Sequence, residues 1–216
     1  MMHIVRLSLI AAAALILCAP PASAQPQEPI GPFAADVRVA VPNFNEDADI
    51  AGALGVGLDN LPGRGLGLSG GAHWYLGRLG RVTLGLGGEI LIARGSRTLE
   101  PADEGGPEGP TVTTRVSVVS PQVSLNFGTG RGWSYVTAGL GWAGFRTERA
   151  DDPVAAAPSR PRVLNYGGGA RWFAKEHLAF TVDLRFYAVN AQEAAAGRPV
   201  YPKTRLMVIS AGVAFK

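Results

Sequence analysis

The most regular pattern in the chain is an alternation of apolar and polar residues over positions 178–190. Because successive side chains of a β-strand point to opposite faces, this alternation predicts a strand with two different faces. One face holds no charge, whereas the other carries Asp183 and Arg185. The uncharged face is made of Leu178, Phe180, Val182, Leu184, Phe186 and Ala188. An extensive apolar environment must cover these side chains.

Eight segments of this kind follow one another along the chain, and the connectors between them alternate between long and short. An even number of strands joined by hairpins lets the last strand pair with the first, so that no edge stays open. The pattern therefore predicts an all-β fold, an eight-stranded antiparallel up-and-down barrel. The expected strands are 33–41, 64–76, 81–93, 111–127, 133–145, 162–173, 178–190 and 203–216.

The connectors and one irregular strand complete the outline. The long connectors, 42–63, 94–110, 146–161 and 191–202, are rich in Gly, Pro and polar residues and are expected to be solvated loops. In the fourth strand Pro121 lacks a backbone donor and Arg115 occupies an apolar position. We therefore expect a β-bulge near Ser120.

The first 24 residues have the layout of a cleaved secretory signal, with Arg6, an apolar run over 7–18 and the small residues Ala22-Ser23-Ala24. The mature chain is expected to start at Gln25, with a short tail to residue 32 and a barrel domain over 33–216. The apolar run is shorter than the ~20 residues that a spanning helix needs, and no later run approaches that length. We therefore expect no helical membrane anchor.

Cysteine content and charge exclude several classes of function. The single cysteine, Cys18, follows Leu17, which is too large for the usual lipoprotein site, and it leaves with the signal. A mature chain without cysteine has no disulfides and no thiolate chemistry. Without Arg6 the chain holds 19 basic residues (20 minus one) against 17 acidic ones, a net charge of +2. So slight a basic excess predicts no nucleic-acid partner.

Alternation alone leaves two environments open for the apolar face, a ligand cavity as in a soluble lipocalin-like barrel or a lipid bilayer. Three features favour lipid. Glycines crowd the polar face, and the interior of an eight-stranded barrel is just wide enough for side chains. Short turns at one end and long loops at the other are typical of outer-membrane barrels, as are aromatic girdles near the strand ends. The residues expected to face lipid or form the girdles are Phe33, Trp74, Phe127, Trp133, Trp142, Trp172, Phe180, Phe186 and Phe215.

With lipid outside, the charged residues of the polar face lie in the lumen. Buried ions need partners, so we expect these residues to form a paired network that fills the lumen, in preference to a proton or ion path. The expected network consists of Asp36, Arg38, Glu89, Arg171, Asp183 and Arg185.

In this organisation the chain resembles the small outer-membrane β-barrels of the OmpA-like, OmpX-like and opacity-protein group. Signal, strand number, alternating loop lengths and strands such as YGGGARWF and HLAFTVDLRFYAV carry the resemblance. It implies insertion into the outer membrane of a Gram-negative-type bacterium, with barrel-assembly machinery recognising the C-terminal strand. The family usually ends in an aromatic residue, whereas here Phe215 is followed by Lys216.

Motifs for catalysis, cofactors or metals are weak. Residues 65–70 match GxGxxG, but no helix is expected after them, as a dinucleotide site requires. Residues 67–71 match GxSxG with Ser69 as nucleophile, yet His73 would lie ~13 Å along the same strand, beyond hydrogen-bond reach. Some barrels of this group are lipid A deacylases or palmitoyltransferases with Ser and His near the outer leaflet, whereas His73 and His177 belong to the opposite end. Two isolated histidines do not predict a metal site.

The sequence thus predicts a non-enzymatic outer-membrane barrel, without catalytic residues, cofactor or metal. We expect a monomer with a structural or surface-contact role carried by loops 42–63, 94–110, 146–161 and 191–202, and with membrane lipid and an unidentified extracellular molecule as partners. A secreted lipocalin-like carrier of an apolar ligand is the alternative, and a lipid-modifying barrel enzyme is a third possibility.

Overall fold

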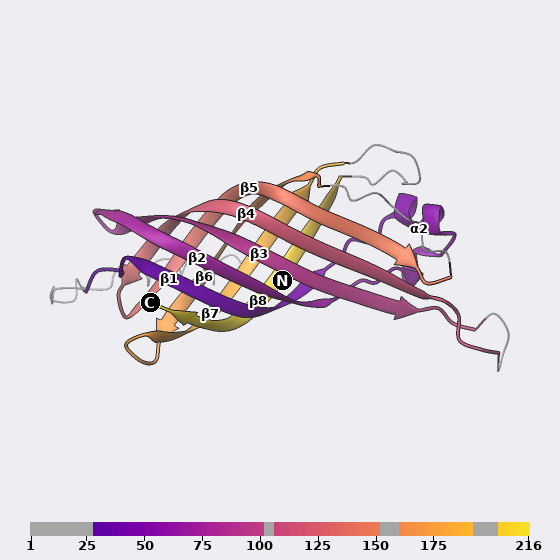
Figure 1. Ribbon diagram of the computed structural model, residues 1–216, viewed down its shortest axis with the longest axis horizontal. Coiled ribbons are helices and arrows are strands. Elements are labelled where there is room, and N and C mark those ends of the chain that lie inside the picture. Colours follow the sequence, from indigo (N-terminus) through magenta and orange to yellow (C-terminus); the bar gives the residue numbers. More distant parts are fainter. Residues whose placement is uncertain (1–27, 102–105, 152–159, 192–202) are drawn as a thin grey trace, which may run out of the picture.

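The computed structural model describes residues 28–101, 106–151, 160–191 and 203–216, and the expected signal lies outside them. Eight antiparallel strands form one closed, elongated barrel in which each strand pairs with its neighbours in sequence (Figure 1). The predicted fold class is confirmed. The strands are β1 (Phe33–Asn43), β2 (Leu66–Leu79), β3 (Val82–Thr98), β4 (Thr111–Thr129), β5 (Gly132–Arg149), β6 (Arg162–Phe173), β7 (Leu178–Val189) and β8 (Thr204–Phe215).

The barrel closes between the first and the last strand. Ala35 on β1 pairs with Phe215 on β8, and the antiparallel ladder continues to Asn43 and Met207. The other side of β1 pairs with β2. Closure gives every strand two partners and leaves no edge of the sheet open.

Strands β3 and β5 continue further on the long-loop side than their alternation predicts, and together with β4 they project beyond the other strands (Figure 1). Hydroxyl pairs link the strands of this extension across the ladder. Thr98 and Thr111 lie 3.1 Å apart, and Thr114 and Thr147 lie 3.0 Å apart, measured between their Oγ1 atoms. Such cross-strand threonine pairs stabilise antiparallel sheets without an apolar face. Parts of the expected loops 94–110 and 146–161 therefore belong to strands.

The bulge expected near Ser120 is wrong. On one side, Glu89 pairs with Ser120 without any shift of register. On the other side, the pairs Val119–Trp142 and Gln122–Gly139 keep one register, so Pro121 interrupts the ladder without adding a residue. The register shift between β2 and β3 lies instead between Tyr75 and Gly77.

The long-loop half of β4 is irregular in sequence because the polar and apolar faces exchange sides there. Arg115 points outward, whereas Val116 and Val118 are buried inside the barrel. They belong to an apolar cluster that fills the long-loop half of the lumen. This cluster consists of Ala40, Phe44, Leu91, Ala93, Val116, Val118, Ala143, Val163, Tyr187, Val189, Leu206 and Val208.

A short helix, α2 (Ala48–Leu54), covers the mouth at the same end, in a connector that was expected to be loop. Asp47 accepts hydrogen bonds from the backbone N–H groups of Asp49 and Ile50, and Gly55 ends the helix with a φ of 62°. These are the usual caps of a helix. Ile50 packs with Val112 of β4 in a small apolar cluster beneath the helix. A 3-10 turn, η1 (Leu58–Asn60), follows.

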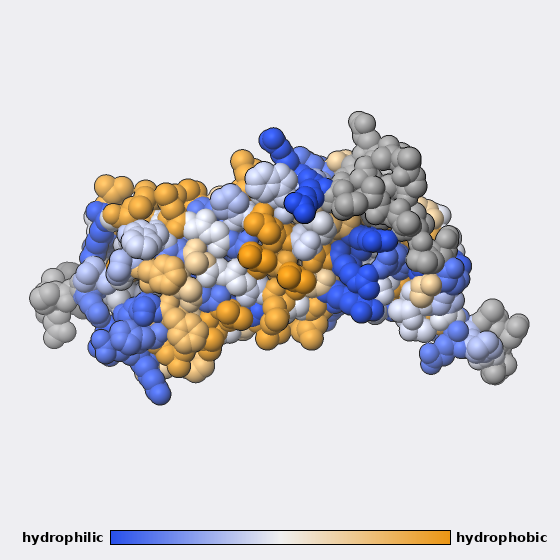
Figure 2. Space-filling model, viewed as in Figure 1, coloured by the Kyte–Doolittle hydropathy of each residue, from blue (hydrophilic) through white to orange (hydrophobic). Residues whose placement is uncertain are grey.

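The outer wall of the barrel is apolar. Hydrophobic side chains gather over the middle of the wall, whereas the most hydrophilic ones lie toward the two ends (Figure 2). On β7 alone, Phe180, Val182 and Leu184 are 63%, 44% and 42% exposed. Within the described ranges, no helix is long and apolar enough to cross a membrane.

Candidate functional site

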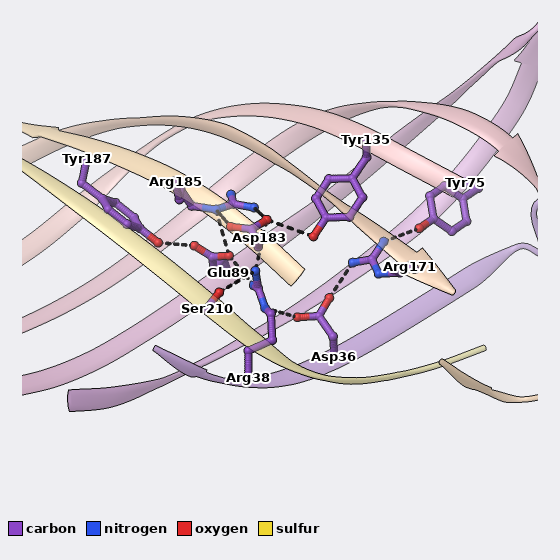
Figure 3. Close-up of polar contacts among 10 residues, drawn as sticks. All are labelled: Asp36, Arg38, Tyr75, Glu89, Tyr135, Arg171, Asp183, Arg185, Tyr187 and Ser210. Carbon is purple, nitrogen blue, oxygen red and sulfur yellow. Dashed lines mark hydrogen bonds and ion pairs between the residues drawn. The ribbon is translucent and has the colours of Figure 1, made fainter. Parts of the chain in front are cut away.

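Three arginines and three carboxylates meet inside the barrel (Figure 3). They come from β1, β3, β6 and β7, and each is at most 4% exposed. Because their positions share the inward parity of their strands, alternation places them all in the lumen. These six residues, which we call the lumen network, are those expected from the sequence: Asp36, Arg38, Glu89, Arg171, Asp183 and Arg185.

Arg38 is the centre of the lumen network. Its Nε lies 2.8 Å from Oδ1 of Asp36, its Nη2 lies 2.6 Å from Oε2 of Glu89, and its Nη1 lies 3.1 Å from Oδ2 of Asp183. Nη1 also donates a hydrogen bond of 3.4 Å to Oγ of Ser210. A single guanidinium thus contacts all three carboxylates, from two other strands as well as its own.

Arg171 extends the network toward the short-turn end. Its Nη2 lies 2.5 Å from Oδ2 of Asp36, and its Nη1 donates a hydrogen bond of 3.0 Å to the hydroxyl of Tyr75. The guanidinium carbon lies 4.6 Å from the centre of the Tyr135 ring. A cation over an aromatic face is attracted by the ring quadrupole, so the ring adds to the ion pair.

Arg185 closes the network on the other side. Its Nη2 lies 2.8 Å from Oδ2 of Asp183, and its Nε lies 3.3 Å from Oε2 of Glu89. Each carboxylate therefore contacts at least two arginines. With three guanidiniums against three carboxylates, the lumen network carries no net charge, as buried ions require.

The tyrosines were missed as members of the network. Tyr135 donates a hydrogen bond of 2.9 Å to Oδ2 of Asp183, and Tyr187 donates one to Oε1 of Glu89. The sequence could have indicated both tyrosines. Tyr187 shares the parity of Asp183 on one strand, and Tyr135 lies on the glycine-rich face of another. A buried tyrosine hydroxyl needs a partner, and the inward carboxylates provide it.

Trp133 was expected among the outward aromatic residues, and this is wrong. Its side chain is 3% exposed and packs at the short-turn end of the lumen, with ring centres 5.8 Å from Tyr75 and 5.1 Å from Phe173. The reason is parity, since Trp133 is an odd-numbered residue of β5 like the inward Tyr135. Its burial completes a second apolar cluster, formed by Ile30, Ala34, Tyr75, Trp133 and Tyr135 with Phe173 against it.

The other expected girdle residues lie on the outer wall, although Trp142 lies near the middle of β5. Phe186 is half-buried because its ring stacks on Tyr166 at 5.5 Å between centres. Phe33 packs edge-on against Trp74 at 6.4 Å. The exposed members are Phe33, Trp74, Phe127, Trp142, Trp172, Phe180 and Phe215.

The two apolar clusters enclose the lumen network. Tyr187 belongs to the cluster at the long-loop end, whereas Tyr75 and Tyr135 belong to the one at the short-turn end. Along the barrel axis the lumen therefore passes from aromatic packing through paired ions to aliphatic packing. This arrangement is a filled core and favours a closed lumen.

The candidate nucleophile Ser69 and His73 both point into the lumen, where they are 4% exposed. Among the described residues, neither the hydroxyl of Ser69 nor the two ring nitrogens of His73 have a hydrogen-bond partner. An activated serine needs a base within hydrogen-bond reach. His177 is exposed in the turn before β7, with Nε2 3.9 Å from Glu176. Over all the residues that the structure describes, no group of three or more His, Cys, Asp or Glu side chains could hold a metal ion.

Comparison with known proteins gives the fold its context. No protein-family model matches the sequence, and no curated protein matches it. Solved structures do match. Neisserial surface protein A aligns with a TM-score of 0.53 and 12% identity over 86% of this chain and 97% of its own. The outer membrane protein OprG from Pseudomonas aeruginosa aligns with a TM-score of 0.50 and 12% identity over 88% and 97%. The chain has the fold of the small eight-stranded outer-membrane β-barrels.

For a small outer-membrane barrel fold, the position of the ions is the informative feature. Leu184 lies outside and Asp183 and Arg185 lie inside, the reverse of a carrier that holds an apolar ligand in its cavity. The lipocalin-like alternative therefore does not fit the interior of this barrel.

Proposed function

We propose that the protein is an integral outer-membrane barrel without enzymatic activity, which contributes to the envelope as a closed structural unit and makes surface contacts through its long-loop end. One observation carries this proposal: a wall of exposed apolar side chains encloses a lumen filled by a neutral network of buried ions. In water such an arrangement would be inside out. In a bilayer, lipid covers the apolar wall and the ions stay paired inside. A closed barrel also leaves no backbone group unpaired in the lipid.

The orientation follows from the loops. The short turns lie on the periplasmic side and the long connectors face the exterior, as in other barrels of this type. The extension of β3, β4 and β5 and the capped mouth under α2 then form the surface that meets the environment. A closed lumen favours surface contact over general diffusion as the role of this end. The C-terminal strand is the segment that barrel-assembly machinery would recognise.

A charge placed on the wall tests the proposal against a soluble barrel. Leu184 on the wall and Leu58 in the loop turn η1 are 42% and 44% exposed. In a bilayer, Leu184→Arg puts a guanidinium near the middle of the membrane and costs ~2–4 kcal/mol. Leu58→Arg puts the same group in water and changes stability by less than ~0.5 kcal/mol.

The measurements are retention in the membrane fraction after a carbonate wash and heat-modifiable gel mobility of the refolded protein in vesicles. We expect the native chain and Leu58→Arg to stay in the membrane fraction and to change their gel mobility on heating. We expect Leu184→Arg to insert poorly. Equal behaviour of the two variants, or a native chain that stays soluble without detergent, would contradict membrane insertion.

A further inference from the structure

The segment before β1 lies across the short-turn mouth of the barrel. At one end Pro32 joins β1, and its carbonyl oxygen accepts a hydrogen bond of 2.8 Å from the N–H of Tyr75 on β2. At the other end, the carbonyl oxygen of Glu28 accepts one of 2.8 Å from the N–H of Gly130, in the turn between β4 and β5. Since β5 is four strands from β1 in either direction around the closed sheet, the segment reaches the opposite wall. We call residues 28–32 the strap.

One side chain of the strap is buried in the lumen. Ile30 is 8% exposed and belongs to the apolar cluster at the short-turn end, together with Tyr75 and Trp133. The hydroxyl of the same tyrosine accepts the hydrogen bond from Arg171, so this cluster borders the lumen network directly. The strap therefore covers the side chains that lie between the buried ions and the short-turn mouth.

A glycine in the turn between β4 and β5 lets the strap approach closely. A Cβ on Gly130 would lie 2.8 Å from the carbonyl oxygen of Pro29 and 3.0 Å from Cδ of Glu28. In a close-packed structure there is no room for such a contact, so a larger residue at this position would displace the strap. By contrast, a Cβ on Gly77, beside the turn between β2 and β3, would meet no atom within 4 Å.

Lys216, which follows β8, lies against the strap. Its N–H donates a hydrogen bond of 3.3 Å to the carbonyl oxygen of His177, in the turn between β6 and β7, and this bond fixes the backbone. A Cβ on Gly31 would lie 4.0 Å from Cδ of Lys216, so the aliphatic part of the side chain runs beside the strap. The side chain is 13% exposed, which is low for a lysine. It is therefore held over the mouth and does not extend into water.

The ammonium group of Lys216 joins the strap to the opposite side of the mouth. Nζ donates a hydrogen bond of 2.5 Å to the carbonyl oxygen of Gly130, and it lies 4.5 Å from the centre of the Phe173 ring on β6. It also lies 3.9 Å from Oε1 of Glu28, whose side chain is exposed. An ion pair of this kind adds little, whereas the carbonyl and the ring stabilise a cation that has lost most of its water.

We propose that the strap closes the short-turn mouth of the barrel and that Lys216 is the latch that holds it there. The strap belongs to no strand, so it can leave the mouth while the eight strands stay paired, and the lumen network then meets water from this end. Lysine suits the position because phenylalanine could pack on Phe173 but could not donate to the carbonyl oxygen of Gly130. This inference deepens the proposed function and rests on it, since it assigns the closure of the lumen to particular residues.

The test follows amide hydrogen exchange of the folded protein in detergent micelles, where both mouths meet water. Lys216→Met keeps the length of the side chain and removes the charge and the donors. Lys175→Met is the matched control, since Lys175 is an exposed lysine in the turn between β6 and β7, at the same end. The reporter is the N–H of Gly130, which its bond to Glu28 protects. We expect this N–H to exchange about tenfold faster in Lys216→Met and at the native rate in the control, while the N–H of Leu184 in β7 keeps its native rate in both.

A second variant moves the strap while the latch stays in place. Gly130→Ala pushes Pro29 away from the turn, and Gly77→Ala is its control. The readout is quenching of Trp133 by acrylamide, in a background without the other tryptophans, Trp74→Phe/Trp142→Phe/Trp172→Phe. We expect Gly130→Ala and Lys216→Met to raise the quenching of Trp133, and the two control variants to leave it at the native level.

Three outcomes would overturn the inference. The first is an exchange rate of the Gly130 N–H that is unchanged in Lys216→Met or equally fast in Lys175→Met. The second is faster exchange at Leu184 in Lys216→Met, because Lys216 would then stabilise the whole barrel and not the strap. The third is equal quenching of Trp133 in the native chain and in Gly130→Ala, because the strap would then not close the mouth.

The outcome is distinguishable from a failure of the proposed function. A protein that shows heat-modifiable mobility and carbonate-resistant retention, but has the same exchange rate at Gly130 in the native chain and in Lys216→Met, keeps the membrane assignment and loses the latch. A protein that shows neither property loses the membrane assignment itself.

Discussion

Replacing Arg38 with methionine tests the idea that the lumen network holds the barrel together. Methionine keeps much of the length of the side chain but removes the charge and all the donors. Arg38 contacts Asp36, Glu89 and Asp183 at 2.8, 2.6 and 3.1 Å, and all four residues are at most 4% exposed. The variant therefore leaves three carboxylates against two guanidiniums in a space closed to water.

The expected cost is large because the charge that remains is buried. Breaking a buried ion pair by removing one partner destabilises a protein by ~3–5 kcal/mol. With a denaturant dependence of ~2 kcal/mol per molar urea, the midpoint of unfolding should fall by ~1.5–2.5 M. Arg205→Met is the control, since Arg205 is exposed on β8 and its loss should change the free energy of unfolding by less than ~0.5 kcal/mol.

The assay is urea unfolding of the refolded barrel in vesicles, followed by the folded and unfolded bands on an unheated gel. A double variant, Arg38→Met/Glu89→Gln, returns the network to two charges of each sign. We expect its cost to be smaller than the sum of the two single costs by at least ~1 kcal/mol, because the two residues interact directly. A midpoint for Arg38→Met that matches the Arg205→Met control, or strictly additive costs, would refute the reasoning.

Two further predictions concern the interior. A Cβ on Gly169 would lie 2.2 Å from the carbonyl oxygen of Val182, whereas a Cβ on Gly70 would have its nearest neighbour at 3.5 Å. Gly169→Ala should therefore lower the urea midpoint of unfolding, and Gly70→Ala should leave it unchanged. Trp133→Ala should cost ~3–5 kcal/mol because it empties the short-turn end of the lumen. Trp172→Ala on the outer wall, where the ring is 54% exposed, should cost clearly less in the same assay, and equal costs would place Trp133 outside.

Alternation of residues and of loop lengths was enough to predict the barrel, and the crowding of glycines on the polar face indicated that this face lines the lumen. In a sheet with one polar and one apolar face, parity decides which residues share a face, so Asp183 and Arg185 fall together on the polar face. What parity cannot give is the partner of each charge across the barrel. The contacts of Arg38 with Glu89 and Asp183 depend on strand tilt and on the reach of the side chains.

The errors arose where the rule was applied by residue type instead of by position. Trp133 was placed outside because tryptophan is common in girdles, although its odd number on β5 put it with Tyr135. The bulge near Ser120 was inferred from Pro121 and from Arg115, whose outward position instead marks the point where the apolar band ends. At that height the outside becomes polar and the inside, at Val116, becomes apolar.

The helix over the mouth was missed although its caps are local. Asp47 and Gly55 flank the run ADIAGAL, which contains Gly52 in its interior and is short, and isolated helices of this length are not stable in water. Packing of Ile50 against Val112 stabilises it, and that contact joins segments far apart in the sequence.

The pairing of β1 with β8 also has a consequence for the order of events during biogenesis. Ala35 lies on the first strand of the barrel, whereas its partner Phe215 lies on the eighth. Until β8 arrives, one side of β1 and one side of β7 have no partner, and lipid offers no hydrogen bonds in exchange. The sheet is therefore satisfied in a bilayer only once β1 and β8 pair, so a barrel closed in this way cannot be inserted one strand at a time.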